Sequence, residues 1–182
     1  SEAEKMIEVV EAQVKARVGE YIYAVDDENM EEVVAKLLKD NCLTVACAES
    51  CTGGMLASRL TSISGSSMYI KGSIVTYSNE AKMKFLDVDK EILDTKGAVS
   101  PEVAKQMAEG VRKAVGSDIG VGITGIAGPT GGTDKKPVGL VYIAVAGKDN
   151  TVVKENVFSG DRARVRYRST QQALEMIRQY IK

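Results

Sequence analysis

The chain has 182 residues, with 24 basic and 25 acidic side chains and a formal net charge of −1. This balance gives no electrostatic reason to expect a nucleic-acid or lipid partner, and the two Phe, seven Tyr and absent Trp argue against a base-stacking surface. The length fits one domain with a small appendage, and 44% apolar residues suffice for a sizeable core. No apolar run approaches the roughly 20 residues of a membrane-spanning helix.

The three cysteines, Cys42, Cys47 and Cys51, are odd in number and crowded. With no signal peptide before them, they favour small thiols buried in a reducing cytosol over a disulfide. The C-x4-C-x3-C spacing, the absence of histidine and the lack of a fourth thiol argue against zinc. We therefore expect a cytoplasmic protein that requires no metal.

The first 40 residues contain two helix patterns. Residues 2–18 have the spacing of a weak amphipathic helix, which Gly19 ends. Residues 21–25 predict a short strand. Apolar residues then recur with helical spacing from Met30 to Leu38, which predicts a helix with one buried stripe.

From Leu43 onward, short β-rich segments alternate with helical patterns. The strands are predicted at 43–48, 72–77, 119–124, 139–146 and 151–158, and the helices at 52–62, 79–86, 101–115 and 161–181. Two strands are almost continuously small and apolar, which predicts helices on both faces of the sheet. The short link at 147–150 predicts a hairpin between the last two strands. The fold class is therefore a three-layer α/β/α sandwich with a mixed, mostly parallel sheet.

Three loops are rich in glycine and hydroxyl side chains: 50–54, 62–67 and 124–132. The first and third follow predicted strands, and ligands of open α/β sheets collect beyond the carboxyl ends of strands. The first loop also precedes a helix, so its backbone N–H groups and the helix N-terminus favour an anionic ligand. None of the loops matches a P-loop or a dinucleotide fingerprint.

Without histidine, a nucleophilic Ser50 needs a lysine, a carboxylate or a tyrosine as its base. Lys82 is a candidate, one turn inside a helix that Ser78 can cap. A lysine base must be neutral, so its pKa must fall from about 10.4 toward about 7–8. Tyr77 is either a half-buried strand residue or a hydrogen-bond donor and proton relay beside Lys82.

Several other side chains keep two interpretations at this stage. Glu49 is either an acid or base, or an anchor for the turn through backbone N–H groups. Cys51 at a helix N-terminus is either a thiol nucleophile or, as we favour, a small buried residue. Arg162 lies where the last strand meets the last helix and can bind an anion in fork geometry. Ser67 remains an alternative nucleophile to Ser50.

Six motifs occur in order from Leu43 to the end of the chain. They are Ala48-Glu49-Ser50-Cys51-Thr52-Gly53-Gly54, Tyr77-Ser78-Asn79-Glu80-Ala81-Lys82, Gly97-Ala98-Val99-Ser100, Thr124-Gly125-Ile126-Ala127-Gly128-Pro129, Lys136-Pro137-Val138-Gly139 and Phe158-Ser159-Gly160-Asp161-Arg162. Together they resemble the CinA C-terminal domain family.

The resemblance implies a serine amidohydrolase of nicotinamide mononucleotide with a Ser/Lys dyad, placed here on Ser50 and Lys82, and no cofactor. It further implies supporting or substrate-contacting groups at Tyr77, Ser67, Thr124 and Arg162. To the binding residues we add Glu49, Gly125 and the turn Thr52, Gly53 and Gly54, whose N–H groups we expect to stabilise the oxyanion. The product would be nicotinic acid mononucleotide, in pyridine nucleotide salvage. The alternative is a non-catalytic nucleotide-binding or regulatory module.

The resemblance also bears on domain organisation and partners. Residues 1–40 resemble the linker of full-length CinA proteins, so we expect an extension at 1–40 and the amidohydrolase domain at 41–182. The chain begins with Ser1 and looks like the C-terminal part of such a protein, whose N-terminal domain would be a partner. The family resemblance further implies a homo-oligomer, a dimer or larger.

Overall fold

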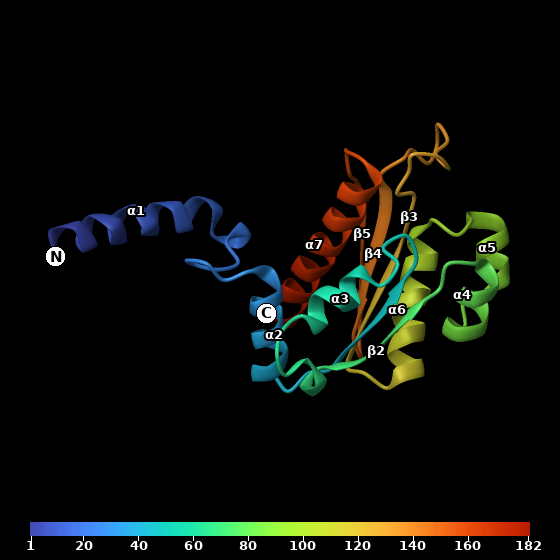
Figure 1. The fold of residues 1–182 in the computed structure, drawn as a ribbon, viewed down its shortest axis with the longest axis horizontal. Helices are drawn as coiled ribbons and strands as arrows, with labels where there is room; N and C mark the ends of the chain where they lie inside the picture. Colours follow the sequence, from blue (N-terminus) through green and yellow to red (C-terminus); the bar gives the residue numbers. More distant parts are fainter.

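The computed structural model describes residues 1–182 and contains one five-stranded sheet (Figure 1). The strands lie in the order β2-β1-β3-β4-β5. Their bounds are Val45–Glu49 for β1, Ile70–Val75 for β2, Ile119–Gly125 for β3, Leu140–Ala146 for β4 and Thr151–Val157 for β5. Each lies within a few residues of its predicted position.

The direction of the strands makes the sheet mixed. β1 pairs in parallel with β2 and β3, whereas β4 is antiparallel to both β3 and β5. β4 alone therefore runs against the other strands, and β4 and β5 form the predicted hairpin. The carboxyl ends of β1, β2 and β3 meet at one edge of the sheet, where ligands of open α/β sheets collect.

Helices cover both faces of the sheet, as expected for an α/β/α sandwich (Figure 1). One face is covered by α2 (Met30–Asp40), α3 (Met55–Thr61) and α7 (Arg162–Ile181), and the other by α4 (Asn79–Leu86), α5 (Lys90–Lys96) and α6 (Pro101–Val115). Alternate residues of β1 point into the two cores: Val45 and Cys47 into the first, Ala46 and Ala48 into the second. The short helix α5 was not predicted.

Helix α6 packs unusually close to β3 because β3 has glycine at two positions facing it. A Cβ atom at Gly120 would lie 2.0 Å from the carbonyl oxygen of Ala108, and one at Gly122 would lie 2.4 Å from that of Ala104. Any side chain at these positions would push the helix away from the sheet.

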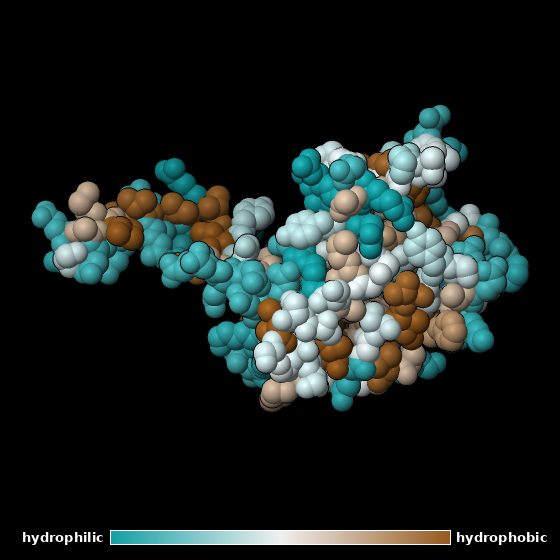
Figure 2. Space-filling model, in the orientation of Figure 1, coloured by the Kyte–Doolittle hydropathy of each residue, from teal (hydrophilic) through white to brown (hydrophobic).

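The first helix projects away from this body (Figure 1). α1 (Glu2–Val18) has no buried residue, and its apolar side chains gather along the arm in Figure 2. A cavity of about 600 Å³ lies between α1 and residues 22–25. The predicted strand at 21–25 is wrong: a 3-10 turn, Gly19–Tyr21, ends in an extended segment that pairs with no strand. Arg178 of α7 holds the arm by donating to the carbonyl oxygen of Glu20 at 2.9 Å.

Helix α2, by contrast, belongs to the body. Met30, Val34, Ala35 and Leu38 are at most 5% exposed and lie in the same core as α7. The expected boundary between residues 40 and 41 therefore cuts α2 from the core into which it packs. None of the helices has the length and apolar character needed to cross a bilayer.

Candidate active site

A pocket of about 290 Å³ opens at the carboxyl ends of β1 and β3. Six predicted site residues line it: Ser50, Tyr77, Lys82, Thr124, Gly125 and Arg162. The remaining lining comes from Cys51, from Ala98 and Val99 before α6, and from the glycine-rich loop after β3 (Ile126–Gly128, Thr130 and Gly131). The fold thus brings together motifs that lie more than a hundred residues apart in the chain.

Ser50 and Lys82 form a direct contact in this pocket. The Lys82 Nζ atom lies 3.2 Å from Ser50 Oγ and donates to the carbonyl oxygen of Thr76 at 2.8 Å. Ser50 directly follows β1, and Lys82 lies on the first turn of α4, whose N-cap is Ser78. A neutral lysine that donates one N–H to Thr76 keeps its lone pair for the Ser50 hydroxyl, which is the geometry required of a base.

Burial prepares Lys82 for that role. The residue is 1% exposed, and no salt bridge joins it to a carboxylate. Removing the ammonium from water lowers the pKa of Lys82 below its ordinary value. By the same cause the pKa of the neighbouring Cys51 thiol rises to about 11, so Cys51 is a neutral thiol at pH 7. Cys51 is therefore a small buried residue of the pocket, as the sequence favoured.

Glu49 anchors the turn that follows β1. Its fully buried carboxylate accepts hydrogen bonds from the backbone N–H groups of Gly54 at 3.1 Å, Leu56 at 3.1 Å and Ala57 at 2.9 Å. It therefore provides acceptors for the free backbone N–H groups at the N-terminus of α3, where a negative charge is favoured. Of the two interpretations of Glu49, the anchor is the one that the structure supports, and the residue does not line the pocket.

This anchoring changes the candidate oxyanion donors. The Gly54 N–H donates to Glu49, and the Gly53 N–H donates to the carbonyl oxygen of Ser50 at 3.1 Å. The N–H groups of Cys51 and Thr52 donate to no acceptor in the protein. The expectation of an oxyanion site made by Thr52, Gly53 and Gly54 is therefore wrong for the two glycines.

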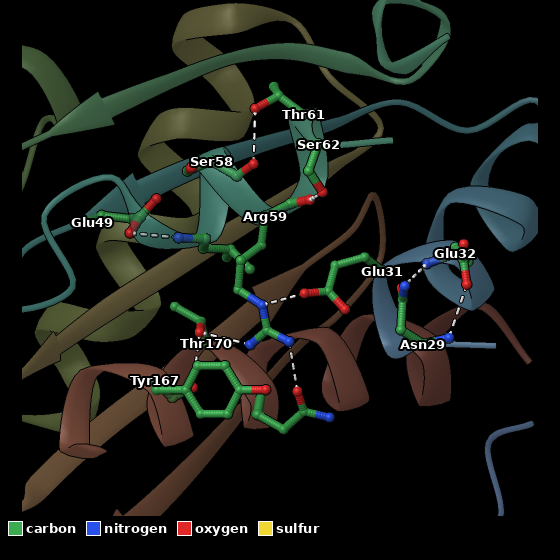
Figure 3. Close-up of polar contacts among 12 residues, drawn as sticks. Asn29, Glu31, Glu32, Glu49, Ser58, Arg59, Thr61, Ser62, Tyr167 and Thr170 are labelled. Carbon is green, nitrogen blue, oxygen red and sulfur yellow. Dashed lines mark hydrogen bonds and ion pairs between the residues drawn. The ribbon is translucent and has the colours of Figure 1, made fainter. Parts of the chain in front are cut away.

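A polar cluster holds α3 against its neighbours (Figure 3). The Arg59 guanidinium donates to Glu31 of α2 at 2.6 Å, to Thr170 of α7 at 2.8 Å and to Gln171 of α7 at 2.6 Å. It also stacks on the Tyr167 ring, 4.7 Å from the centroid. Since α3 carries the Ser50 turn at its N-terminus, this cluster fixes the turn relative to two helices.

Arg166 supports the same turn from α7. Its Nη2 donates to the carbonyl oxygen of Thr52 at 2.7 Å. Arg166 is therefore partly buried and does not simply face solvent. Helical periodicity cannot show that a turn a hundred residues earlier offers a carbonyl group at this place.

Tyr77 and Arg162 form the mouth of the pocket. Arg162 donates from Nη1 to the carbonyl oxygen of Gly128 at 3.0 Å and from Nη2 to the Tyr77 hydroxyl at 2.9 Å. Tyr77 is 62% exposed, and its hydroxyl bonds to neither Ser50 nor Lys82. In this arrangement Tyr77 positions Arg162, and a proton relay through Tyr77 would require it to turn inward.

Three other predicted residues lie differently from expectation. Thr124 lines the pocket, but its hydroxyl donates to the carbonyl oxygen of Ala98 at 2.7 Å. Thr52 is fully buried, and its hydroxyl has no partner and does not line the pocket. Ser67 is exposed beside the amino end of β2, whereas Ser50 follows the carboxyl end of the neighbouring β1. Ser67 is therefore at the opposite end of the sheet and does not reach the site.

The family model of the CinA C-terminal domain matches residues 27–181. The chain belongs to this family. The match begins just before α2, in agreement with the packing of that helix in the core.

Curated relatives and solved structures agree with this assignment. A putative competence-damage inducible protein of Thermoanaerobacter sp. is 52% identical over 99% of this chain, and a CinA-like protein of Kosmotoga olearia is 49% identical over 97%. The chain spans only 44% and 43% of these two relatives. The competence/damage inducible protein CihA of Agrobacterium tumefaciens superposes with a TM-score of 0.79 at 40% identity, over 85% of this chain and 96% of that one. The competence or damage-inducible protein of Enterobacter asburiae gives a TM-score of 0.81 at 31% identity, over 86% and 100%.

Proposed function

We propose that this CinA-family chain is an amidohydrolase that converts nicotinamide mononucleotide to nicotinic acid mononucleotide and ammonia. The observation that carries the proposal is the contact between a buried lysine amine and a serine hydroxyl in a pocket at the carboxyl end of the sheet. A hydroxyl beside a lysine of lowered pKa is the arrangement of an activated nucleophile.

The reaction would proceed in two balanced steps. Lys82 takes the proton of Ser50, whose Oγ bonds to the carboxamide carbon while the free N–H group of Cys51, which lines the pocket, stabilises the oxyanion. The C–N bond then breaks, and the proton held by Lys82 passes to the leaving nitrogen, which departs as ammonia. Water, deprotonated by Lys82, attacks the ester carbon, and Ser50 leaves with that proton to give the free carboxylic acid.

The mouth of the pocket would hold the anionic end of the substrate. Arg162 is the one cationic side chain at the mouth, and its planar fork suits a phosphate group. Two of its N–H groups already bond to Gly128 and Tyr77. A phosphate would therefore use the remaining donors or displace Tyr77.

The test is ammonia release from nicotinamide mononucleotide by the parent chain and by Ser50→Ala, Lys82→Ala and Lys84→Ala. We expect both dyad variants to lose more than about 10²-fold in turnover, as nucleophile and base variants do. Lys84, exposed on the same helix, is the matched control and should retain parental turnover. A folded parent without turnover would overturn the proposal and favour the nucleotide-binding module, provided that calorimetry shows binding of the mononucleotide.

Two partners complete the proposal. The relatives are about twice as long as this chain, so a further domain of the longer proteins is one partner. A second copy of this chain in a homo-oligomer is the other. Light scattering of the purified chain measures whether it forms a homo-oligomer. The same measurement on a full-length relative shows whether the further domain changes that assembly.

A further inference from the structure

Two walls of the pocket are loops that belong to different parts of the chain. Ala98 and Val99 lie in the short link between α5 and α6, and Thr130 and Gly131 lie in the long loop after β3. Neither wall is part of a helix or a strand. The distance between these walls therefore depends on the contacts that hold each loop. Arg162 and β4 hold the second wall through Gly128 and Ile126.

Lys136 provides the contact between the two loops. Its side chain leaves the base of the long loop, and its Nζ atom donates to the carbonyl oxygen of Lys96 at 2.6 Å and to that of Val99 at 2.7 Å. The two accepting residues bracket Ala98, whose own carbonyl oxygen accepts from Thr124 at 2.7 Å. The wall is thus held from one side by β3 and from the other by Lys136.

The contacts around Lys136 hold its amine in one position. A Cβ atom at Gly97 would lie 3.3 Å from Lys136 Nζ, so the amine packs directly against the backbone of the wall. The long loop is closed behind Lys136 by a tight turn, in which the N–H of Thr133 donates to the Lys136 carbonyl oxygen at 2.8 Å and the reverse bond measures 3.1 Å. No carboxylate forms a salt bridge with Lys136, so its charge is directed to backbone carbonyl groups alone.

We propose that Lys136 is a positioning residue that sets the width of the pocket and thereby the affinity for substrate. It does not line the pocket and takes no part in the chemistry at Ser50. Without its ammonium group, the 97–99 wall and the 126–131 wall separate, while the dyad, held by β1 and α4, stays in place. The part of this proposal that concerns the substrate rests on the proposed amidohydrolase function, whereas the part that concerns the walls does not.

The test compares Lys136→Met, Lys136→Arg and the control Lys135→Met, whose side chain is the exposed neighbour. Hydrogen exchange is measured first, because it needs no substrate. We expect Lys136→Met to speed exchange at 97–99 and 126–131 by about tenfold or more, with the helices unchanged. Lys136→Arg should restore most of the protection, since a guanidinium can donate to both carbonyl groups.

Kinetics and binding then separate positioning from catalysis. For Lys136→Met we expect KM to rise about tenfold while kcat stays within about threefold, which is the pattern of lost binding rather than lost chemistry. If the parent has no turnover, calorimetry with nicotinic acid mononucleotide replaces the kinetics. Unchanged exchange at both walls in Lys136→Met overturns the proposal whether or not the chain is an amidase, and so does a fall in kcat at constant KM.

Discussion

Glu49 and Ser50 are adjacent in the chain, yet their side chains serve opposite sides of one turn. The Glu49 carboxylate is fully buried beneath α3, whereas the Ser50 hydroxyl lies in the pocket, 3.2 Å from Lys82. Successive residues at the end of a strand point to opposite faces of the sheet. Glu49 therefore anchors the turn on one side, and Ser50 presents its hydroxyl to the pocket on the other.

We expect Glu49→Gln to lower the free energy of unfolding by about 2–3 kcal/mol, because an amide replaces a buried charged acceptor of three backbone N–H groups. Turnover should also fall, since the turn carries Ser50. Urea unfolding measures the first effect. Glu91→Gln, at an exposed position in the first turn of α5, is the control and should shift stability by less than about 0.5 kcal/mol.

The pH dependence of turnover follows from the burial of Lys82. The neutral amine is the active form, so kcat/KM should rise with pH to a plateau. The midpoint of this rise should lie below the ordinary lysine pKa of 10.5. A pH–rate profile from about pH 6 to pH 10 measures this midpoint. A profile that is flat or falls with pH across this range would contradict a lysine base.

The lowered pKa of Lys82 should also make the free energy of unfolding depend on pH. The folded state holds Lys82 at a lowered pKa, so between that pKa and about 10.5 the unfolded chain binds more protons than the folded one. The stability that the parent has relative to Lys82→Met should therefore grow as pH rises through this window, and be smallest at lower pH. Urea unfolding of both proteins at several pH values checks the slope, with Lys84→Met as control.

The Arg59–Glu31 pair should contribute measurably because its side chains are only 10% and 17% exposed. A double-mutant cycle of Arg59→Met and Glu31→Gln should give a coupling energy of about 1–3 kcal/mol. The exposed pair Lys36–Asp40 is the matched control, and its cycle should give about 0.5 kcal/mol or less. Equal coupling in the two pairs would show that partial burial in the cluster of Figure 3 does not strengthen the Arg59–Glu31 pair.

Truncation separates the arm from the domain. Removal of residues 1–26 takes away no buried side chain, and we expect the melting temperature to change by less than about 4 °C. Removal of residues 1–40 deletes Met30, Val34, Ala35 and Leu38 from the core, and should prevent folding or cost several kcal/mol. Calorimetry of both truncated chains locates the boundary, and equal stability of the two would place it after α2.

Prediction from sequence failed where the local pattern was too short, or where the outcome depended on distant segments of the chain. Residues 21–25 have the composition of a strand, but no strand of the sheet lies beside them. The helix α5 was missed because seven residues are too short for a periodic signal, although Asp89 and Gly97 flank it as cap residues. Ser67 shares the residue types of the Ser50 loop, but it lies at the wrong end of a strand.

The sequence by itself determined the fold class, the order of the elements and the Ser50 and Lys82 motifs, because hydrophobic periodicity, caps and short motifs act over a few residues. Only the tertiary structure decided which groups meet. It placed Lys82 Nζ beside Ser50 Oγ, gave the Gly54 N–H to Glu49, and brought Lys136 to carbonyl groups 37 and 40 residues away. Burial and hydrogen bonding between distant segments arise only when the sheet assembles, and the pKa of Lys82 depends on that burial.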